Sequence, residues 1–351
     1  MSDPSRVELG EVTVPSGNLF LVDCGLLPLW CHDQPPVMPD DILDPDRTAD
    51  VNASADLELV GKDAVAFGET LDRSPLPQWI FDILASEVDA MVAKLTAQAS
   101  AAGAEVEVRI VRPQITHLQR AKAVLEALDA GEVQFYGIRG TVVRGIPSDR
   151  PLSVSAEVHR GSEYEGRWER VRVSVSDAPV ATSAAAGTVA VDEARILVTD
   201  LDAVGAWDPE SAPDGLADVA FWGRDGEVLA QQENAPRMED GTFGWQNLPM
   251  DAAVPLARRL FTLRETRDDL KFALDFRPHT VEWHLLEQVR YGGTESGTVE
   301  FGGAKATMFM TTWGDGFFDV FRDLDRDGNL VAVRIELAAT GLDMMQRMRG
   351  S

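Results

Sequence analysis

Cysteine and lysine are both scarce in this chain of 351 residues. Two cysteines, Cys24 and Cys31, are too few to staple a chain of this length with disulfides, so we expect a protein of the reducing cytoplasm. Lysine occurs at only five positions, and arginine supplies most of the positive charge. The 32 basic residues are outnumbered by 58 acidic ones, which gives a formal net charge of -26.

Charge and hydropathy argue against several kinds of partner. A strongly acidic protein repels phosphate backbones and anionic lipid headgroups, so we expect neither nucleic-acid nor membrane binding. No run of about 18 apolar residues is present to span a bilayer, and we expect no targeting leader in residues 1–17. The chain also lacks Gly-x-Ser-x-Gly, a phosphate-binding glycine loop ending in lysine, and His-Glu-x-x-His. These absences favour a binding protein over an enzyme.

Hydrophobic periodicity predicts the fold class. Helical spacing is present at residues 77–103, 116–130 and 251–264, the last with Asp251 as its expected N-cap. Alternation of apolar and polar residues dominates after Pro147, for example at residues 152–159. We predict an α+β protein, in which a mostly antiparallel, sandwich-like β domain carries an inserted or N-terminal helical α/β subdomain.

Domain boundaries are expected where this periodicity changes. Residues 1–35 are predicted to form N-terminal strands that pack with the C-terminal β domain, and residues 36–147 a helical α+β region. The β-rich domain then spans residues 148–340, and residues 341–351 form a tail.

Residues 312–330 carry the most concentrated chemical signal, with five aspartates and three glycines among aromatic residues. Asp323, Asp325 and Asp327 have the spacing of the first ligands of a calcium loop, but Arg334 stands where that loop needs a glutamate. The simplest interpretation is a β-hairpin that turns at Asp327-Gly328 and keeps its carboxylates in water. We therefore expect no cofactor. The alternative is a loop that binds calcium or magnesium through these three aspartates.

Two cysteines and a histidine near the N-terminus are ligand types for zinc. Cys24, Cys31 and His32 are accompanied by Asp23 and Asp33, but the six residues between the cysteines exceed the usual spacing of zinc ligands. Buried cysteines and a loop histidine explain the same residues.

A second pair of histidines lies at His279 and His284, followed by Glu287. On a helix His284 and Glu287 would share one face, whereas the spacing of His279 and His284 would separate them. We expect these histidines to be structural, with a catalytic or ligating role as the alternative.

A short internal echo links residues 224–230 and 326–332, which both place Asp-Gly between apolar residues. Asp-Gly between strand-like runs is typical of a hairpin, so we expect one at each place. The echo is too short to indicate a duplicated domain.

Three segments resemble the bacterial domain of unknown function 4241. They are Ser16-Gly17 with the apolar run to Asp23, the segment Ala217-Asp218-Val219-Ala220-Phe221-Trp222, and Thr311-Thr312-Trp313-Gly314-Asp315-Gly316 with the Asp-Gly hairpin after it. The resemblance covers about residues 7–30 and 150–337 and implies a mostly β domain bracketed by its N-terminal and C-terminal strands. It implies no activity. If both landmarks belong to one sheet, Asp23 lies within about 15 Å of Asp315, on the scale of packed strands.

Two functions of different classes follow from these observations. The first is a cytoplasmic accessory protein, of a regulatory or immunity type, whose acidic surface binds a basic protein. The alternative is a metal-dependent hydrolase, in which Asp315 acts with Asp319 or Asp323 and in which His284 or His32 transfers protons.

Overall fold

The computed structural model describes residues 6–36, 45–71, 76–160 and 163–343. The predicted tail beyond residue 343 lies outside this description. The chain divides into two compact units, one formed by Met1–Trp207 with Gly292–Ser351 and the other by Asp208–Tyr291. Each unit has its own sheets and core.

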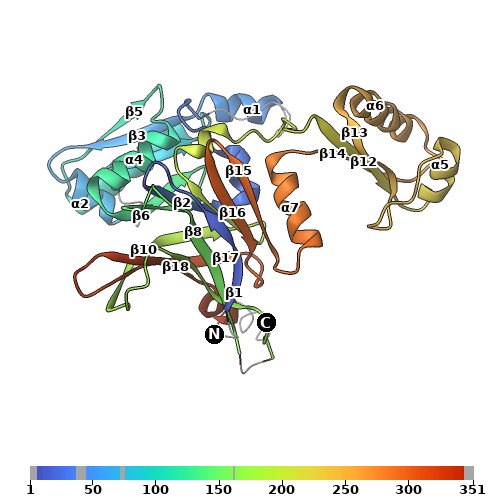
Figure 1. Cartoon of the computed structure of the whole chain (residues 1–351). Coiled ribbons are helices and arrows are strands. Elements are labelled where there is room, and N and C mark those ends of the chain that lie inside the picture. The colour runs from blue at the N-terminus through green and yellow to red at the C-terminus, as the bar shows by residue number, and fades with distance from the viewer. Residues whose placement is uncertain (1–5, 37–44, 72–75, 161–162, 344–351) are drawn as a thin grey trace. The chain divides into compact units, whose positions relative to one another are not determined.

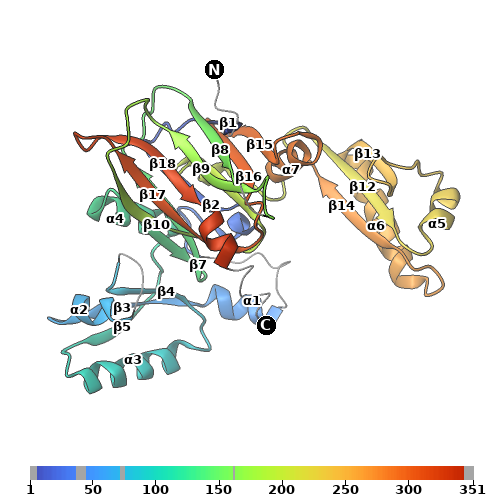
Figure 2. The ribbon, with the colours of Figure 1, turned by 90° about the horizontal axis from the view of Figure 1, so that it is seen from below.

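The larger unit is built on two six-stranded antiparallel sheets, here called sheet A and sheet B (Figures 1 and 2). In order across sheet A the strands are β1 (Arg6–Val12), β8 (Leu152–Val158), β9 (Trp168–Ser174), β18 (Leu330–Glu336), β17 (Gly316–Leu324) and β10 (Thr182–Val191). In order across sheet B they are β15 (Ser296–Phe301), β16 (Ala304–Met310), β11 (Arg195–Asp200), β2 (Asn18–Asp23), β7 (Ile138–Arg144) and β6 (Ala130–Phe135). Short 3-10 helices follow two central strands, η1 (Cys24–Leu29) after β2 and η2 (Ala203–Ala206) after β11.

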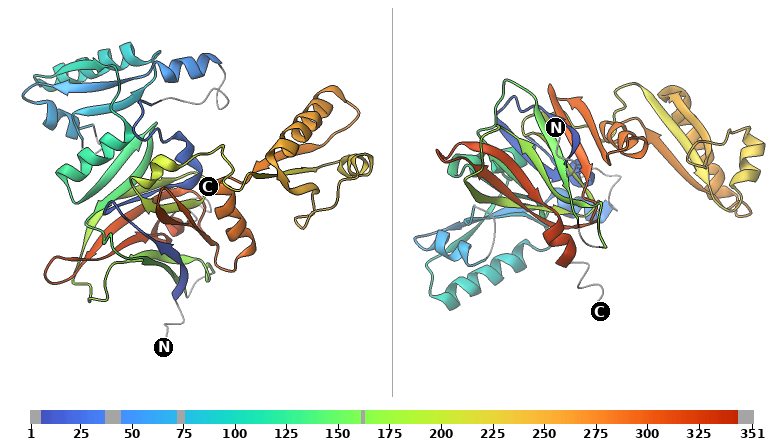
Figure 3. Two further views of the ribbon diagram at one scale, coloured as in Figure 1. Left: turned by 45° about the horizontal axis from the view of Figure 1, so that its top comes forward. Right: turned by 60° about the horizontal axis from the view of Figure 1, so that its bottom comes forward.

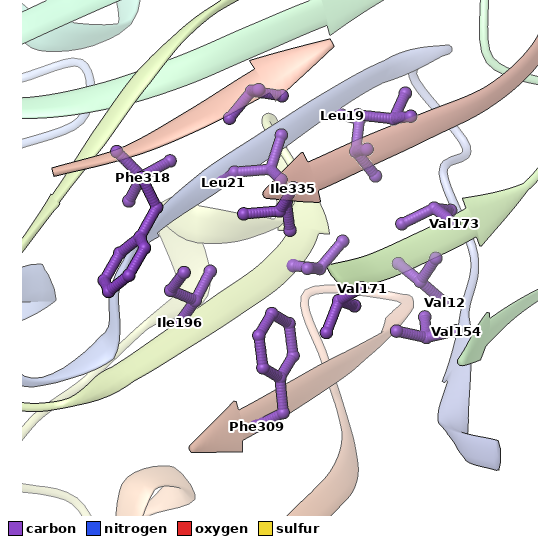
Figure 4. Packing of buried hydrophobic residues seen from close by; sticks show 14 of the residues in the cluster. Val12, Leu19, Leu21, Val154, Val171, Val173, Ile196, Phe309, Phe318 and Ile335 are labelled. Atoms are coloured by element: carbon purple, nitrogen blue, oxygen red, sulfur yellow. The ribbon is translucent and has the colours of Figure 1, made fainter. Parts of the chain in front are cut away.

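One apolar core lies between the two sheets, as Figure 4 shows. Sheet A contributes Phe318 and Ile335 to it, and sheet B contributes Leu21, Ile196 and Phe309. Alternation along each strand sends every second side chain into this layer. These features confirm the prediction of an α+β protein with a largely antiparallel, sandwich-like β domain.

A three-stranded module, here called the first module, is inserted between β2 and β6. Its sheet has the order β4-β3-β5 and its elements occupy residues 55–127. In chain order they are β3 (Ala55–Val60), α2 (Ala64–Glu69), β4 (Trp79–Ile83), α3 (Val88–Ala102), β5 (Glu107–Val111) and α4 (His117–Ala127), with α1 (Pro45–Asn52) before them.

The predicted helix over residues 77–103 is correct only from Val88 onward. Trp79–Ile83 instead forms β4, which pairs with β3 through Leu57 and Ile80. Its aromatic and β-branched residues favour a strand, and helical spacing alone did not separate the two elements. Strands β6 and β7, which precede the expected boundary at residue 147, belong to sheet B, where β7 pairs with β2 and β6 pairs with β7.

The smaller unit, here called the second module, has the sheet order β13-β12-β14 and can be followed by its yellow and orange colours in Figure 3. In chain order its elements are β12 (Leu216–Trp222), α5 (Gly226–Glu233), β13 (Phe243–Pro249), α6 (Met250–Thr266), β14 (Ala273–Pro278) and α7 (Val281–Tyr291). Helices α5 and α6 pack on one face of this sheet around Phe221, Leu229 and Leu260.

Two predictions about this module need correction. The hairpin expected at Asp225-Gly226 is wrong, because Gly226 begins α5 and the side chain of Asp225 accepts a hydrogen bond from the Lys271 amide at 2.7 Å. The predicted helix at 251–264 is present as α6, but Pro249 rather than Asp251 is its N-cap.

Among the described residues, none of the helices combines the length and the apolar character that a bilayer crossing requires.

Gly10 and Gly187 allow the two sheets to meet closely. Their φ angles of 155° and 147° are rare for residues with a side chain. A Cβ on Gly10 would lie 2.7 Å from Thr307 Oγ1, and one on Gly187 would lie 2.9 Å from Thr141 Oγ1. We predict that Gly10→Ala and Gly187→Ala each lower the free energy of unfolding by about 2 kcal/mol or more, because strain and overlap add.

Urea unfolding followed by circular dichroism measures this effect. Gly293→Ala is the matched control, since no atom lies within 4 Å of its added Cβ. A loss no larger than that of the control would contradict the packing described.

Candidate functional site

The strongest candidate site lies in the second module, on the polar face of its sheet. Along β12, Ala217, Val219 and Phe221 enter the core, so the residues between them point to the opposite face. Asp218 is one of these, and only 4% of its surface is exposed. A buried carboxylate needs hydrogen-bond donors, and the donors of Asp218 define the site.

His279 lies between two carboxylates. It follows β14 directly, with Nδ1 2.9 Å from Asp214 Oδ2 and Nε2 3.1 Å from Asp218 Oδ1. Its ring is buried, and Trp283 stacks on it with 3.7 Å between ring centroids. Contacts on both ring nitrogens and on the ring face fix its orientation.

Asp214 connects His279 to a more exposed histidine. Burial raises the pKa of Asp214, but hydrogen bonds from His279 and from the Leu216 amide outweigh burial and hold that pKa below its usual value. The Nε2 atom of His284 lies 3.8 Å from Asp214 Oδ2, and 31% of the His284 side chain is exposed. Asp214 therefore presents an ionised carboxylate to both imidazoles.

The two histidines are neighbours in space, with 5.9 Å between ring centroids. The separation expected on a helix does not apply to these residues, because α7 begins at Val281 and His279 precedes it. Thr280 caps the helix through its hydroxyl, which accepts a bond from the Trp283 amide.

A pocket of about 210 Å³ opens beside this histidine cluster. Its lining includes Trp283 and Gln246 together with six charged residues. The carboxylates belong to Asp218, Asp240, Asp275 and Glu287, and the guanidinium groups to Arg277 and Arg290. Acidic groups therefore exceed basic ones in the wall.

The charges of the pocket wall differ in how they are paired. Arg277 bonds to Asp275 at 2.6 Å and to Asp240 at 3.2 Å. The side chains of Glu287 and Arg290 form no hydrogen bond or ion pair with the residues that the structure describes. They lie one turn apart on α7, so this helix offers one carboxylate and one guanidinium group to a bound molecule.

Of the residues that the sequence singled out, His279, His284 and Glu287 lie at this site. His32 belongs to the larger unit, where its Nδ1 accepts a hydrogen bond from Trp30 Nε1 at 3.3 Å. Burial lowers the pKa of His32, although the nearby charges of Asp33 and Asp202 oppose this. The proposed combination of Asp315, Asp319 or Asp323 with His284 draws on residues from both units.

The acidic segment forms the predicted β-hairpin between β17 and β18. Asp325 accepts hydrogen bonds from the Asp327 and Asn329 amides and so holds the turn. The expectation that all these carboxylates face water is wrong for Asp323, which is buried. Its carboxylate pairs with Arg334 at 3.1 Å, which offsets the cost of burial. Asp319 is exposed on β17. A loop that binds calcium or magnesium through Asp323, Asp325 and Asp327 stays a prediction.

Asp23 and Asp315 hold the same turn, between β10 and β11. Asp23 accepts from the Glu193 amide at 2.9 Å, and Asp315 accepts from the Ala194 amide at 3.0 Å. Consecutive Cα atoms lie about 3.8 Å apart, so the two carboxylates lie well within the expected distance. Both are engaged by backbone amides, which is a structural role.

The cysteines lie apart from a ligand cluster. Cys24 is buried in η1, and the Cys31 amide donates to His117 Nδ1 at 3.0 Å. In the parts of the chain that the structure describes, no three side chains of His, Cys, Asp or Glu are grouped to hold a metal ion. The zinc site with Asp23, His32 and Asp33 also stays a prediction.

The first module contains a buried arginine among carboxylates. Arg120 is 1% exposed and bonds to both oxygens of Asp82, at 2.7 and 2.8 Å, and to Asp56 at 3.4 Å. Its guanidinium group lies 4.2 Å from the ring centroid of Phe81. Burial alone would raise the pKa of Asp82, but Arg120 holds it below its usual value.

Sequence reasoning missed Asp214, Asp218 and Arg277. One signal was present, since Asp218 is a lone acidic residue inside the apolar run 217–222. Such a residue in a strand is typical of a buried, partnered carboxylate.

No family model, curated protein or solved structure matches this chain. The resemblance to the domain of unknown function 4241 therefore stays a prediction.

His117, beside Arg120, yields a prediction about pH. Burial and the charge of Arg120 lower its pKa to about 3, whereas the unfolded residue titrates near pH 6.5. Below about pH 6.5 His117 binds a proton in the unfolded state but not in the folded state. The free energy of unfolding therefore falls as pH is lowered, by up to about 1.4 kcal/mol per pH unit. Above that pH this contribution is constant.

His117→Asn keeps an acceptor for the Cys31 amide and removes the titration. We expect a shallower loss of stability between pH 6.5 and about pH 4 in the variant, measured by urea unfolding at each pH. Parallel pH profiles for wild type and His117→Asn would refute the prediction.

Proposed function

We propose that this protein is a cytoplasmic binding or accessory protein, of a regulatory or immunity type, that captures a cationic side chain of a basic protein partner in the pocket of the second module. The observation that carries the proposal is the pocket wall, in which four carboxylates face two guanidinium groups beside Trp283. Arg277 offsets two of these carboxylates, and Asp218 is held by His279. Glu287 remains as the carboxylate for an incoming cation.

Size and charge both support a side chain as the bound group. The pocket volume of about 210 Å³ is below the range of about 300–1,000 Å³ that is usual for drug-sized ligands. An aromatic wall attracts cations through the ring quadrupole. The net charge of -26 raises the local concentration of a basic partner and speeds its association.

A short blocked peptide of alternating arginine and glycine serves as the probe, with binding measured by isothermal titration calorimetry. We expect Glu287→Gln to weaken binding about tenfold, because roughly 1.4 kcal/mol of charge-assisted bonding is lost. Wild-type affinity should also fall as salt is raised.

Asp319→Asn is the matched control, because it removes the same charge from an exposed position in the sandwich. Equal losses in both variants would show that the overall field, not the pocket, binds the peptide. Absence of binding by the wild type would overturn the proposal.

A metal-dependent hydrolase is the second candidate, and its one supporting feature is the half-exposed His284 next to the ionised Asp214. An imidazole oriented by a carboxylate can transfer protons. On this hypothesis magnesium, calcium or zinc should raise the melting temperature of dialysed protein, because an ion that binds only the folded state stabilises it. Asp323→Asn should abolish that rise, and Asp202→Asn, at a half-exposed position, should keep it. No shift with any of the three ions would remove this candidate.

A further inference from the structure

The first half of the chain contributes strands β1 to β9, and the second half contributes strands β10 to β18 in the same succession. When each strand is replaced by its counterpart in the other half, the strand order of each sandwich sheet is reversed but otherwise unchanged. Sheet A runs β1-β8-β9 and then β18-β17-β10, and sheet B runs β15-β16-β11 and then β2-β7-β6. The modules repeat the pattern, since β4-β3-β5 and β13-β12-β14 both place their first strand in the centre. In each module a short helix follows the first strand and a long helix follows the second.

Residue contacts repeat along with the topology. Residues 10–30 align with residues 187–207 without a gap, which pairs Gly10 with Gly187 and Trp30 with Trp207. Trp30 packs on Phe135 with 5.3 Å between centroids, and Trp207 packs on Phe301 with 5.4 Å.

The aligned aspartates Asp23 and Asp200 make crossed contacts. Asp23 accepts from the Gly25 amide of its own half and from the Glu193 amide of the other half. Asp200 accepts from the Asp202 amide of its own half and from the Ser16 amide of the other. Glu193 and Ser16 are themselves an aligned pair.

The modules carry the same signature. Asp56 and Asp218 both lie at a register shift of the central strand. Asp56 accepts from the Asp82 amide at 3.1 Å and Asp218 from the Asn247 amide at 2.9 Å. Asp82 and Asn247 both have the left-handed φ of 56°.

We infer that the two halves are copies of one unit, and that ligand binding, as proposed above, belongs to the second copy alone because two residues that close the first copy are replaced there. Arg120 is the fourth residue after the helix cap Thr116, and His284 holds that place after Thr280. Phe81 precedes Asp82, and Gln246 precedes Asn247.

The two replacements lie where the copies differ in structure. In the first copy the guanidinium group of Arg120 covers Phe81 and pairs with Asp82. In the second copy His284 is too short to reach across, Asn247 carries no charge to hold an arginine, and Gln246 lines the open pocket. Gln246 is therefore a residue that determines whether the pocket exists.

Restoring the aromatic ring tests this inference without a change in charge. Gln246→Phe should weaken binding of the arginine–glycine peptide at least tenfold and leave the melting temperature unchanged or raised. Gln231→Phe, at an exposed position of α5 in the same module, is the matched control and should bind like the wild type. A crystal structure of Gln246→Phe should show the ring inside the pocket.

The outcomes separate this inference from the proposed function. If the wild type and both variants bind equally, the second-copy pocket is not the binding site that Gln246 controls, and the inference fails. If the wild type does not bind, the proposed function fails, and the crystal structure decides the inference. A ring directed away from the pocket would overturn it, and a ring filling the pocket would support it.

Discussion

Two buried carboxylates hold the centre of the sandwich, and each is used by both halves of the chain. Asp23 bonds to the turn before β11, and Asp200 bonds to the turn before β2. Since β2 and β11 are neighbours in sheet B, these bonds fix both the register of that pair and the position of the adjoining hairpins. A carboxylate that accepts several amide bonds is costly to leave unpaired in the interior. Neither half can therefore keep its central strand in place without the other.

Comparison of the two copies explains why the two modules differ so much in their polar groups. The first module encloses an arginine among two aspartates, a buried ion pair whose desolvation cost is offset only when every partner is present. Removing the arginine would leave the acidic partners uncompensated, so a change there requires a second change. Asn247 in place of Asp82 is such a compensating change, and His279 supplies Asp218 with a new hydrogen-bond partner.

Local patterns made parts of the fold predictable, and long-range contacts made the rest unpredictable. The alternation along β8 and the Asp-Gly turn before β18 are local, and they were interpreted correctly. The spacing of its apolar residues led to the wrong prediction that β4 is helical. The segment is a strand because its pairing with β3 outweighs that spacing. The site was missed because Asp218 and His279 are far apart in sequence, although the lone aspartate in an apolar strand was visible. The internal repeat was missed because few residues are identical, and the short echo at Asp225 belongs to a helix start.

Where the first copy has the contact of Arg120 with Asp82 and Phe81, the second copy has a pocket. In the first copy the cation is part of the chain, so its position costs no loss of translational freedom. In the second copy the corresponding space is lined by acidic groups, an indole and the guanidinium groups of Arg277 and Arg290, and His284 holds the place that Arg120 has in the first copy. On the function proposed above, a cation supplied by another molecule would meet Glu287 and the Trp283 indole there, as Arg120 meets Asp82 and the Phe81 ring in the first copy. The first copy thus gives a physical precedent for the cationic group that we propose as the ligand of the second.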